Sequence, residues 1–219
     1  MEELVDVYSV EVDKVNLIMD RNICEDGTLA TESNKCLIPW HAGANNNNYG
    51  PDTAMTYLYN GTKNWTNVPN MEITYTDENN SGTNYGYTGI TTENGVATIT
   101  GKNGASNTTI GTTSLPLKAR LPKENEVYGT DGNHCTNSEG SCPAWLVDYL
   151  NDSSSPSSSY YPDNELISGI YGYWLLSSNP GDSNNARSVR YFGHVGRDST
   201  SYASHIGVRP VITVSKSDL

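Results

Sequence analysis

The sequence contains a single phenylalanine, and hydrophobic residues make up only 35% of its 219 residues. No uninterrupted apolar segment reaches the roughly 20 residues that a membrane-spanning helix needs, and the apolar core of a secretory signal is absent. We therefore expect no direct membrane insertion by this segment. An export signal or anchor, if the protein has one, would precede Met1.

Basic residues are also scarce: 13 lysines and arginines stand against 25 aspartates and glutamates, which gives a net charge of −12. A protein that binds duplex nucleic acid needs a basic surface to displace the counterions of the phosphates. The anionic lipids of a membrane surface repel an acidic protein for the same reason. The charge balance therefore predicts that nucleic acid is not a partner.

Motifs that carry catalysis are missing. The sequence has no H-E-x-x-H, G-x-S-x-G, Walker A or dinucleotide-binding motif. Each of its four histidines stands alone, as a surface or hydrogen-bonded histidine does: His41, His134, His194 and His205. We therefore expect no catalytic residues, no metal site and no cofactor, and we interpret the protein as a binding module rather than an enzyme.

Four cysteines occur as two local pairs, Cys24 with Cys36 and Cys135 with Cys142. Neither pair has the Cys-x-x-Cys spacing of a zinc knuckle or redox site, and each brackets turn-rich sequence. Two loop-closing disulfides and an oxidising compartment are the prediction. The alternatives are free thiols in a cytosolic protein, or zinc ligation that involves His134.

Alternation of apolar and polar residues predicts several strands. Residues 4–19 have this pattern and would form an opening strand, while short alternating segments separated by Gly and Asn predict a β-rich excursion over residues 70–113. Three later segments are also strand-like: residues 171–178, 189–195 and 207–214.

Helical spacing appears in three places. Apolar residues recur at intervals of three, four and seven over residues 52–65, where Asp52 or Thr53 would cap the helix. Residues 122–128 and 143–150 each begin with a proline, which suits the first turn of a helix. Strands and helices in this order predict an α+β fold.

Three short motifs, in this order, resemble the formylglycine-generating-enzyme superfamily. Residues 117–127, LKARLPKENEV, resemble its R-L-P-T-x-x-E-W segment, and residues 207–212, GVRPVI, resemble its closing G-F-R-V strand. Between them, residues 173–178, YWLLSS, resemble a strand of related bacterial domains that run from Y-W-L-R-S to G-V-R-P. That superfamily has a C-type-lectin-like fold, in which the terminal strands meet and loops display a binding face.

The resemblance implies a C-type-lectin-like fold with paired terminal strands, two main helices and a β-rich insert. A single domain would span residues 1–219, with the insert at residues 70–116 and a C-terminal display region at residues 171–219. Residues 1–70 are more loosely similar to ectodomains of gut-bacterial surface proteins, some of which carry a pilin-like leader. The implied location is the bacterial cell surface.

Within this resemblance, two functions known for such folds are not expected here. Formylglycine-generating enzymes act through a pair of cysteines near the C-terminal site, and this chain has no cysteine after Cys142. The calcium-dependent sugar-binding motifs of animal lectins are absent too.

Arg209 lies within the scaffold motif, and we expect it to form a buried ion pair with Glu124 or Glu126.

Residues 179–206 differ in composition from the rest of the chain. They hold three of the six arginines, the only phenylalanine and two of the four histidines. Lys, Glu, Gln, Met and Trp are missing, although these types fill 26 of the first 178 positions. This window carries a charge of +1, from three arginines and two aspartates, whereas residues 1–178 carry −14. A slightly cationic, aromatic patch on an acidic body favours a protein or glycan ligand.

The missing residue types share a property of their codons: none can be encoded by a codon that ends in a pyrimidine. Adenine-directed mutagenesis of the asparagine codons AAC and AAT reaches Asn, Asp, Ser, Arg, His, Tyr, Phe, Gly and Ile, but never the missing types. In this respect the window resembles the variable proteins of diversity-generating retroelements, which place such positions on C-type-lectin-like scaffolds. The resemblance implies a hypervariable face at residues 179–206.

The pattern within residues 189–195 predicts a strand with one face inward and one outward. Val189, Tyr191, Gly193 and Val195 would pack inward, and Arg190, Phe192 and His194 would point out. The predicted ligand-binding residues are the polar, charged and aromatic members of the window: Asn179, Asp182, Asn184, Asn185, Arg187, Ser188, Arg190, Phe192, His194, Arg197, Asp198, Tyr202 and His205.

The sequence therefore predicts an extracellular ligand-binding module, an adhesin or receptor-binding domain, whose ligand is an unknown protein or glycan. Two alternatives remain open. One is a structural module of a pilus tip or phage tail that binds its assembly partners, and the other is an enzyme of the formylglycine-generating type.

Overall fold

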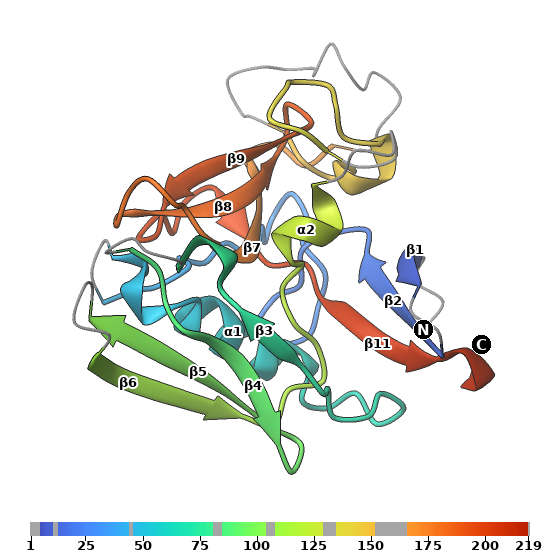
Figure 1. The fold of residues 1–219 in the computed structure, drawn as a ribbon. Helices are drawn as coiled ribbons and strands as arrows, with labels where there is room; N and C mark the ends of the chain where they lie inside the picture. The colour runs from blue at the N-terminus through green and yellow to red at the C-terminus, as the bar shows by residue number, and fades with distance from the viewer. Residues whose placement is uncertain are drawn as a thin grey trace.

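The computed structural model describes residues 5–10, 13–43, 46–80, 85–103, 108–128, 135–151 and 166–218. Within these ranges the chain forms three β-sheets, two α-helices and several 3-10 turns (Figure 1). The mixed α+β class that the sequence predicts is confirmed.

The first sheet joins the two ends of the described chain. Its strands are β1 (Val5–Val10), β2 (Lys14–Met19) and β11 (Val211–Ser215). Strand β2 lies in the middle and pairs antiparallel with both neighbours, with Val211 opposite Ile18. The prediction of one opening strand over residues 4–19 is wrong, because the chain reverses between β1 and β2. Apolar alternation runs through both strands and so does not mark the reversal.

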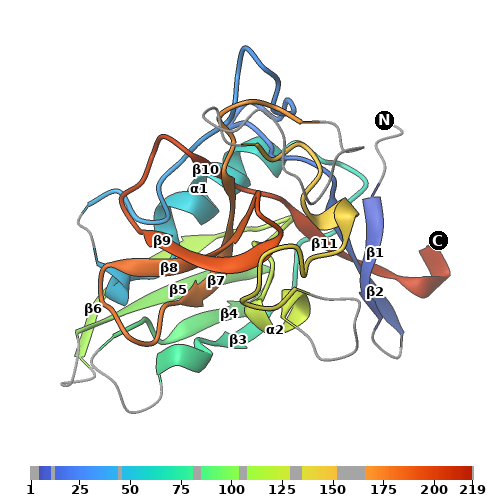
Figure 2. The ribbon, with the colours of Figure 1, turned by 90° about the horizontal axis from the view of Figure 1, so that it is seen from above.

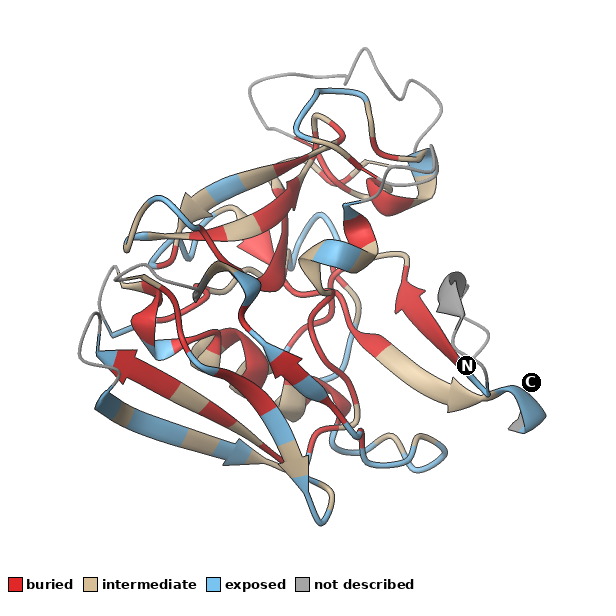
Figure 3. Ribbon diagram, in the orientation of Figure 1, coloured by how far each residue is buried: buried red, intermediate tan, exposed pale blue. Residues whose placement is uncertain are grey.

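The second sheet is formed from part of the C-terminal region, residues 171–219, that the sequence predicts for ligand display. Its strands are β7 (Gly172–Ser178), β8 (Asn185–Arg190), β9 (His194–Ser199) and β10 (Ile206–Gly207). Their order is β10-β7-β8-β9, so β9 forms an edge. Every residue of β7 is buried (Figure 3). Trp174 and Leu176 enter one hydrophobic cluster, and Tyr173 and Leu175 enter another.

The third sheet is an antiparallel meander of β3 (Thr74–Thr76), β4 (Gly89–Glu93), β5 (Val96–Asn103) and β6 (Thr108–Leu115). Its strands confirm the β-rich excursion predicted for residues 70–113. Ala97 and Ile99 of β5 point into the first hydrophobic cluster, whereas the edge strand β6 is mostly exposed. Viewed from above, β8 and β9 lie over this sheet (Figure 2).

Helix α1 (Asp52–Thr62) confirms the helix predicted for residues 52–65. Ala54, Met55 and Leu58 form its buried face, packed in the first hydrophobic cluster. A Cβ atom at Gly61 would lie 2.5 Å from the carbonyl oxygen of Cys24. Glycine in the last turn of α1 therefore lets the N-terminal cysteine loop pack directly against the helix.

The two later helices are shorter than the sequence predicts. Only one turn, α2 (Glu124–Val127), forms within residues 122–128. Residues 143–150 contain the 3-10 turn η4 (Ala144–Leu146) instead of a helix, and Tyr149 further along adopts a positive φ of 60°. The other 3-10 turns are η1 (Asn47–Tyr49), η2 (Glu78–Asn80) and η5 (Lys216–Asp218).

Arg209 is fully buried, but the ion pair predicted with Glu124 or Glu126 does not form. Its guanidinium donates to the carbonyl oxygens of Leu146 and Asp148 and lies 4.6 Å from the ring centre of Tyr173. Backbone carbonyls beside the 3-10 turn η4 are thus the acceptors of this cation. The two glutamates pair with other arginines, Glu126 with Arg120 and Glu124 with Arg187.

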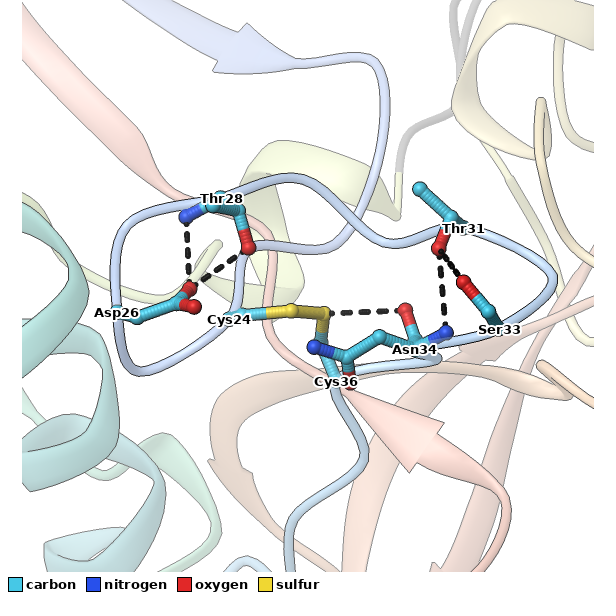
Figure 4. The surroundings of a disulfide bond; sticks show 7 residues. All are labelled: Cys24, Asp26, Thr28, Thr31, Ser33, Asn34 and Cys36. Atoms are coloured by element: carbon cyan, nitrogen blue, oxygen red, sulfur yellow. Dashed lines mark hydrogen bonds between the residues drawn. A yellow bond between two sulfur atoms is a disulfide. The ribbon is translucent and has the colours of Figure 1, made fainter.

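Both predicted disulfides, Cys24–Cys36 and Cys135–Cys142, are present. They close loops with sequence separations of 12 and 7 residues. In the first loop Asp26 accepts hydrogen bonds from the backbone N–H and hydroxyl of Thr28 at 3.0 and 2.7 Å (Figure 4). Paired cysteines in short loops are typical of an oxidising compartment.

Removal of either disulfide is predicted to lower the free energy of unfolding by roughly 2–3 kcal/mol, because the unfolded chain regains the entropy of an open loop. The variants are C24A/C36A and C135A/C142A, and chemical denaturation measures the change. Wild-type protein with added reductant is the control. Equal stability of the oxidised protein and both variants would contradict the prediction.

Candidate ligand-binding site

Strands β8 and β9 form a hairpin whose tip is the turn at residues 191–193. The prediction of one continuous strand over residues 189–195 is wrong. Gly193 adopts a φ of +71°, and its N–H donates to the Arg190 carbonyl at 2.8 Å, which closes the turn. The predicted alternation of burial is confirmed: Val189, Tyr191, Gly193 and Val195 are buried, while Arg190, Phe192 and His194 are half-buried.

The second disulfide loop, residues 135–142, supports the tip of this hairpin. The N–H of Gly140 donates to the carbonyl of Phe192 at 2.8 Å, and the N–H of Cys142 donates to that of Gly193 at 2.9 Å. Each bond satisfies a backbone group of the turn that no strand partner could reach. The disulfide loop therefore fixes the position of the tip.

The loop that leads into the hairpin, residues 179–184, is held by the buried side chain of Asn47. Its amide nitrogen donates to the carbonyls of Asp182 and Asn185, each at 2.8 Å, and its amide oxygen accepts the N–H of Gly86 at 2.9 Å. The side chain of one residue thereby joins the loop to the segment before β4. Because every hydrogen-bonding group involved is buried or half-buried, the loop has a defined conformation.

A buried carboxylate lies beneath the same loop. Asp77 accepts hydrogen bonds from the hydroxyl of Ser178 at 2.5 Å and from its N–H at 3.3 Å, at the end of β7. Burial raises the pKa of Asp77 to about 6, against the opposing effect of the Ser178 hydroxyl. A Cβ at Gly86 would lie 2.5 Å from a carboxylate oxygen of Asp77, so glycine is required there.

Two of the three arginines in the hairpin are held by carboxylates. Arg190 donates to both oxygens of Asp198 at 3.0 and 2.5 Å, and Ser188 donates to the same carboxylate. On the other face of β8, the Nε of Arg187 lies 3.2 Å from a carboxylate oxygen of Glu124. These pairs orient the guanidinium groups and are themselves half-buried.

Six rings form a continuous aromatic strip along one side of the display region. Tyr171 is at its centre, with the ring of His205 stacked 4.3 Å away and that of Tyr191 at 5.6 Å. The strip extends through close ring contacts in both directions. In spatial order its members are Tyr202, His205, Tyr171, Tyr191, Phe192 and His194.

An open cleft of about 490 Å³ lies beside the hairpin. Nitrogen-bearing side chains dominate its lining, and we call it the arginine cleft. They are Asn137, Asn179, Arg187, Arg190, His194 and Arg197. Burial lowers the pKa of His194, and the charge of Arg190 lowers it further, against the weaker effects of Glu139 and Asp198. The His194 ring is therefore neutral at pH 7.

Exposure divides the thirteen predicted ligand-binding residues into three groups. Asn179 and Ser188 are buried, and Asn184, Arg197 and Tyr202 are exposed. The remaining eight are half-buried: Asp182, Asn185, Arg187, Arg190, Phe192, His194, Asp198 and His205. That these residues bind a ligand stays a prediction.

The structure separates the predicted residues by location as well. Five line the arginine cleft and four belong to the aromatic strip, with His194 common to both. Asp182 accepts from Asn184 and Asn185 and shapes the loop instead. Sequence reasoning missed Asn137 and Tyr171, since both lie outside the unusual window and reach the site only through the fold.

Neither a metal site nor a membrane span is found in the described part of the chain. No group of three His, Cys, Asp or Glu residues is placed to hold a metal ion there. No helix among the described residues is long and apolar enough to cross a membrane. His134, the residue considered for zinc, lies outside the described residues.

Comparisons of the chain with protein-family models, with curated proteins and with solved structures found no match. What the protein does must therefore be inferred from the chemistry of this region.

The raised pKa of Asp77 predicts a pH dependence of stability. Between pH 4 and pH 6 the folded protein holds a proton on Asp77 that the unfolded chain has released, so the contribution of this residue to stability falls as pH rises. From pH 4 to pH 7 the loss is about 2 kcal/mol. Denaturation of the wild type and D77N at both pH values measures it.

In that experiment the stability of the wild type relative to D77N is higher at pH 4 than at pH 7. E93Q, at an exposed position of β4, is the matched control and should show little change in the same comparison. A wild-type advantage that grows with rising pH would contradict the assignment.

Proposed function

We propose that the protein is an extracellular ligand-binding module whose binding face consists of the hairpin β8–β9, the loop before it and the aromatic strip. One observation carries this proposal. Partly accessible arginine and aromatic side chains are mounted on a hairpin and loop that buried groups fasten from below, through Asn47, Asp77 and the Cys135–Cys142 loop. Rigid mounting lowers the entropic cost of binding, and arginine and aromatic residues dominate binding hot spots.

We further propose a C-type-lectin-like fold for this frame. Its support is that the three motifs with that resemblance, distant in sequence, meet in space. Arg120 and Val211 exchange backbone hydrogen bonds at 3.0 and 2.8 Å, and the N–H of Leu176 donates to Pro122 at 2.9 Å. The closing strand also pairs with β2, so the terminal strands lie together.

The composition of residues 179–206 supports a further element of the proposal, that this face is diversified by a retroelement. The window contains both a buried frame and accessible positions. Val189 and Val195 pack in the second hydrophobic cluster, while Arg197 and Tyr202 are exposed. Diversification that spares the first pair and alters the second would change the ligand without unfolding the domain. The cell surface is the proposed location.

The source genome tests the diversification proposal. We expect a second, near-identical copy of the segment encoding residues 179–206 beside a reverse-transcriptase gene, with differences confined to adenines of that copy. Sequencing of the gene and its neighbourhood provides the measurement. The absence of such a copy rules out diversification, and differences at all four bases rule out the adenine-directed mechanism.

Substitutions within residues 179–206 should distinguish the side chains that support the fold from those that are available to a ligand. Alanine at Arg197, Tyr202 or Asn184 should change the free energy of unfolding by less than about 0.5 kcal/mol, since these side chains are exposed. The V189A change should cost about 2 kcal/mol because Val189 is fully buried.

Chemical denaturation of the single variants measures these free energies. Destabilisation by the exposed variants as large as that of V189A would show that their side chains support the fold. The display proposal would then be abandoned.

A further inference from the structure

The lining of the arginine cleft offers hydrogen-bond donors and cations but no carboxylate. Three arginines, two asparagines and one histidine supply its polar side chains, and no Asp or Glu is among its described lining residues. The chain as a whole carries a net charge of −12, so a concave surface of this kind is unlike its average surface. Glu124 and Asp198, which pair with two of the arginines, are not among the lining residues.

One cation of the cleft is uncommitted. Arg197 is exposed, and among the described residues its guanidinium has neither an ion-pair nor a hydrogen-bond partner, in contrast to Arg187 and Arg190. Neighbouring Gly196 lets the side chain of Arg190 lie against the backbone of β9, because a Cβ there would lie 2.6 Å from Arg190. A planar guanidinium with free N–H groups favours a carboxylate, which it binds through two parallel hydrogen bonds.

Buried nitrogen atoms without partners are concentrated at the same place. Asn179 is only 4% exposed, and its amide nitrogen has no hydrogen-bond partner among the described residues. The Nδ1 of His194 is also buried without a hydrogen bond in the described structure, whereas the Nε of Arg187 faces a carboxylate oxygen of Glu124 at 3.2 Å. A buried donor left unsatisfied costs about 1–3 kcal/mol, and binding sites are where such costs are retained. Asn179 and His194 both line the cleft, and the accessible area of each of these two nitrogens is below 1 Å².

The apolar part of the lining bears on the kind of ligand. Only Val195 and Pro180 contribute apolar side chains, so the cleft has no pocket for the large aromatic or aliphatic anchor of a protein partner. Its volume of about 490 Å³ lies in the lower half of the range of about 300–1,000 Å³ for small-molecule sites. Hydroxyl groups of a ligand match the amide side chains of Asn137 and Asn179 in the lining.

We propose that the arginine cleft binds an acidic sugar, with its carboxylate on Arg197 and its hydroxyls on the other polar side chains of the lining. This inference rests on the proposed binding function and names its ligand class. It requires no metal ion, because the donors belong to the side chains of the chain itself.

Titration of the whole protein with glucuronic acid and N-acetylneuraminic acid, followed by NMR, tests the proposal. Glucose and N-acetylglucosamine are the uncharged comparison probes, and a short glutamate-rich peptide is the probe for a protein ligand. We expect at least one acidic sugar to bind, with an affinity that falls as salt is added. R197Q should weaken that binding at least tenfold, whereas K63Q, an exposed cation outside the cleft, should leave it unchanged.

The outcomes are distinct. Equal binding of charged and uncharged sugars, binding of the peptide alone, or unchanged binding by R197Q would each overturn the inference, as would no binding of either acidic sugar at millimolar concentration. Because Arg197 is exposed, R197Q is expected to fold, and its unfolding curve verifies this. If neither acidic sugar binds but a retroelement template is present, the acidic-sugar inference fails and the proposed function as a diversified binding module remains. If an acidic sugar binds but the genome has no such template, only the proposal of diversification by a retroelement is rejected.

Discussion

The burial of strand β7 on both faces is the constraint on which the rest of the structure depends. Its side chains alternate between the two hydrophobic clusters. Pairing with β8 lapses between Trp174 and Ser178, and the carbonyls in that gap are taken by side chains instead. The indole of Trp40 donates to Leu175 and the hydroxyl of Tyr87 to Leu176. A strand held in this way fixes the position of the hairpin β8–β9, whose Ala186 and Val189 pack in the same two clusters.

Much of the fold could be predicted because its determinants are local. Apolar spacing identified α1, alternation identified the strands of the meander, and turn-rich brackets identified both disulfides. The errors came from tertiary contacts. The carbonyls of Leu146 and Asp148 accept from Arg209, which lies some sixty residues further along the chain, and no periodicity over residues 143–150 reports these contacts.

The candidate site was less accessible to sequence reasoning. Composition marked the right window, and burial alternates over residues 189–195 as the pattern predicts. Composition treats all members of the window alike, however, and only the fold separates Ser188, beneath Asp198, from exposed Arg197. Asn47, which holds the loop, lies in an asparagine-rich run that reads as an unstructured turn until its partners are known.

The loop closed by Cys135–Cys142 has one more consequence. Its amides hold the turn of the hairpin, so oxidation of this pair and ordering of the tip are thermodynamically linked. By whatever free energy the disulfide stabilises the ordered tip, the ordered tip stabilises the disulfide against reduction by the same amount. The redox state of the surroundings thus acts on the tip of the hairpin, which carries part of the proposed binding face.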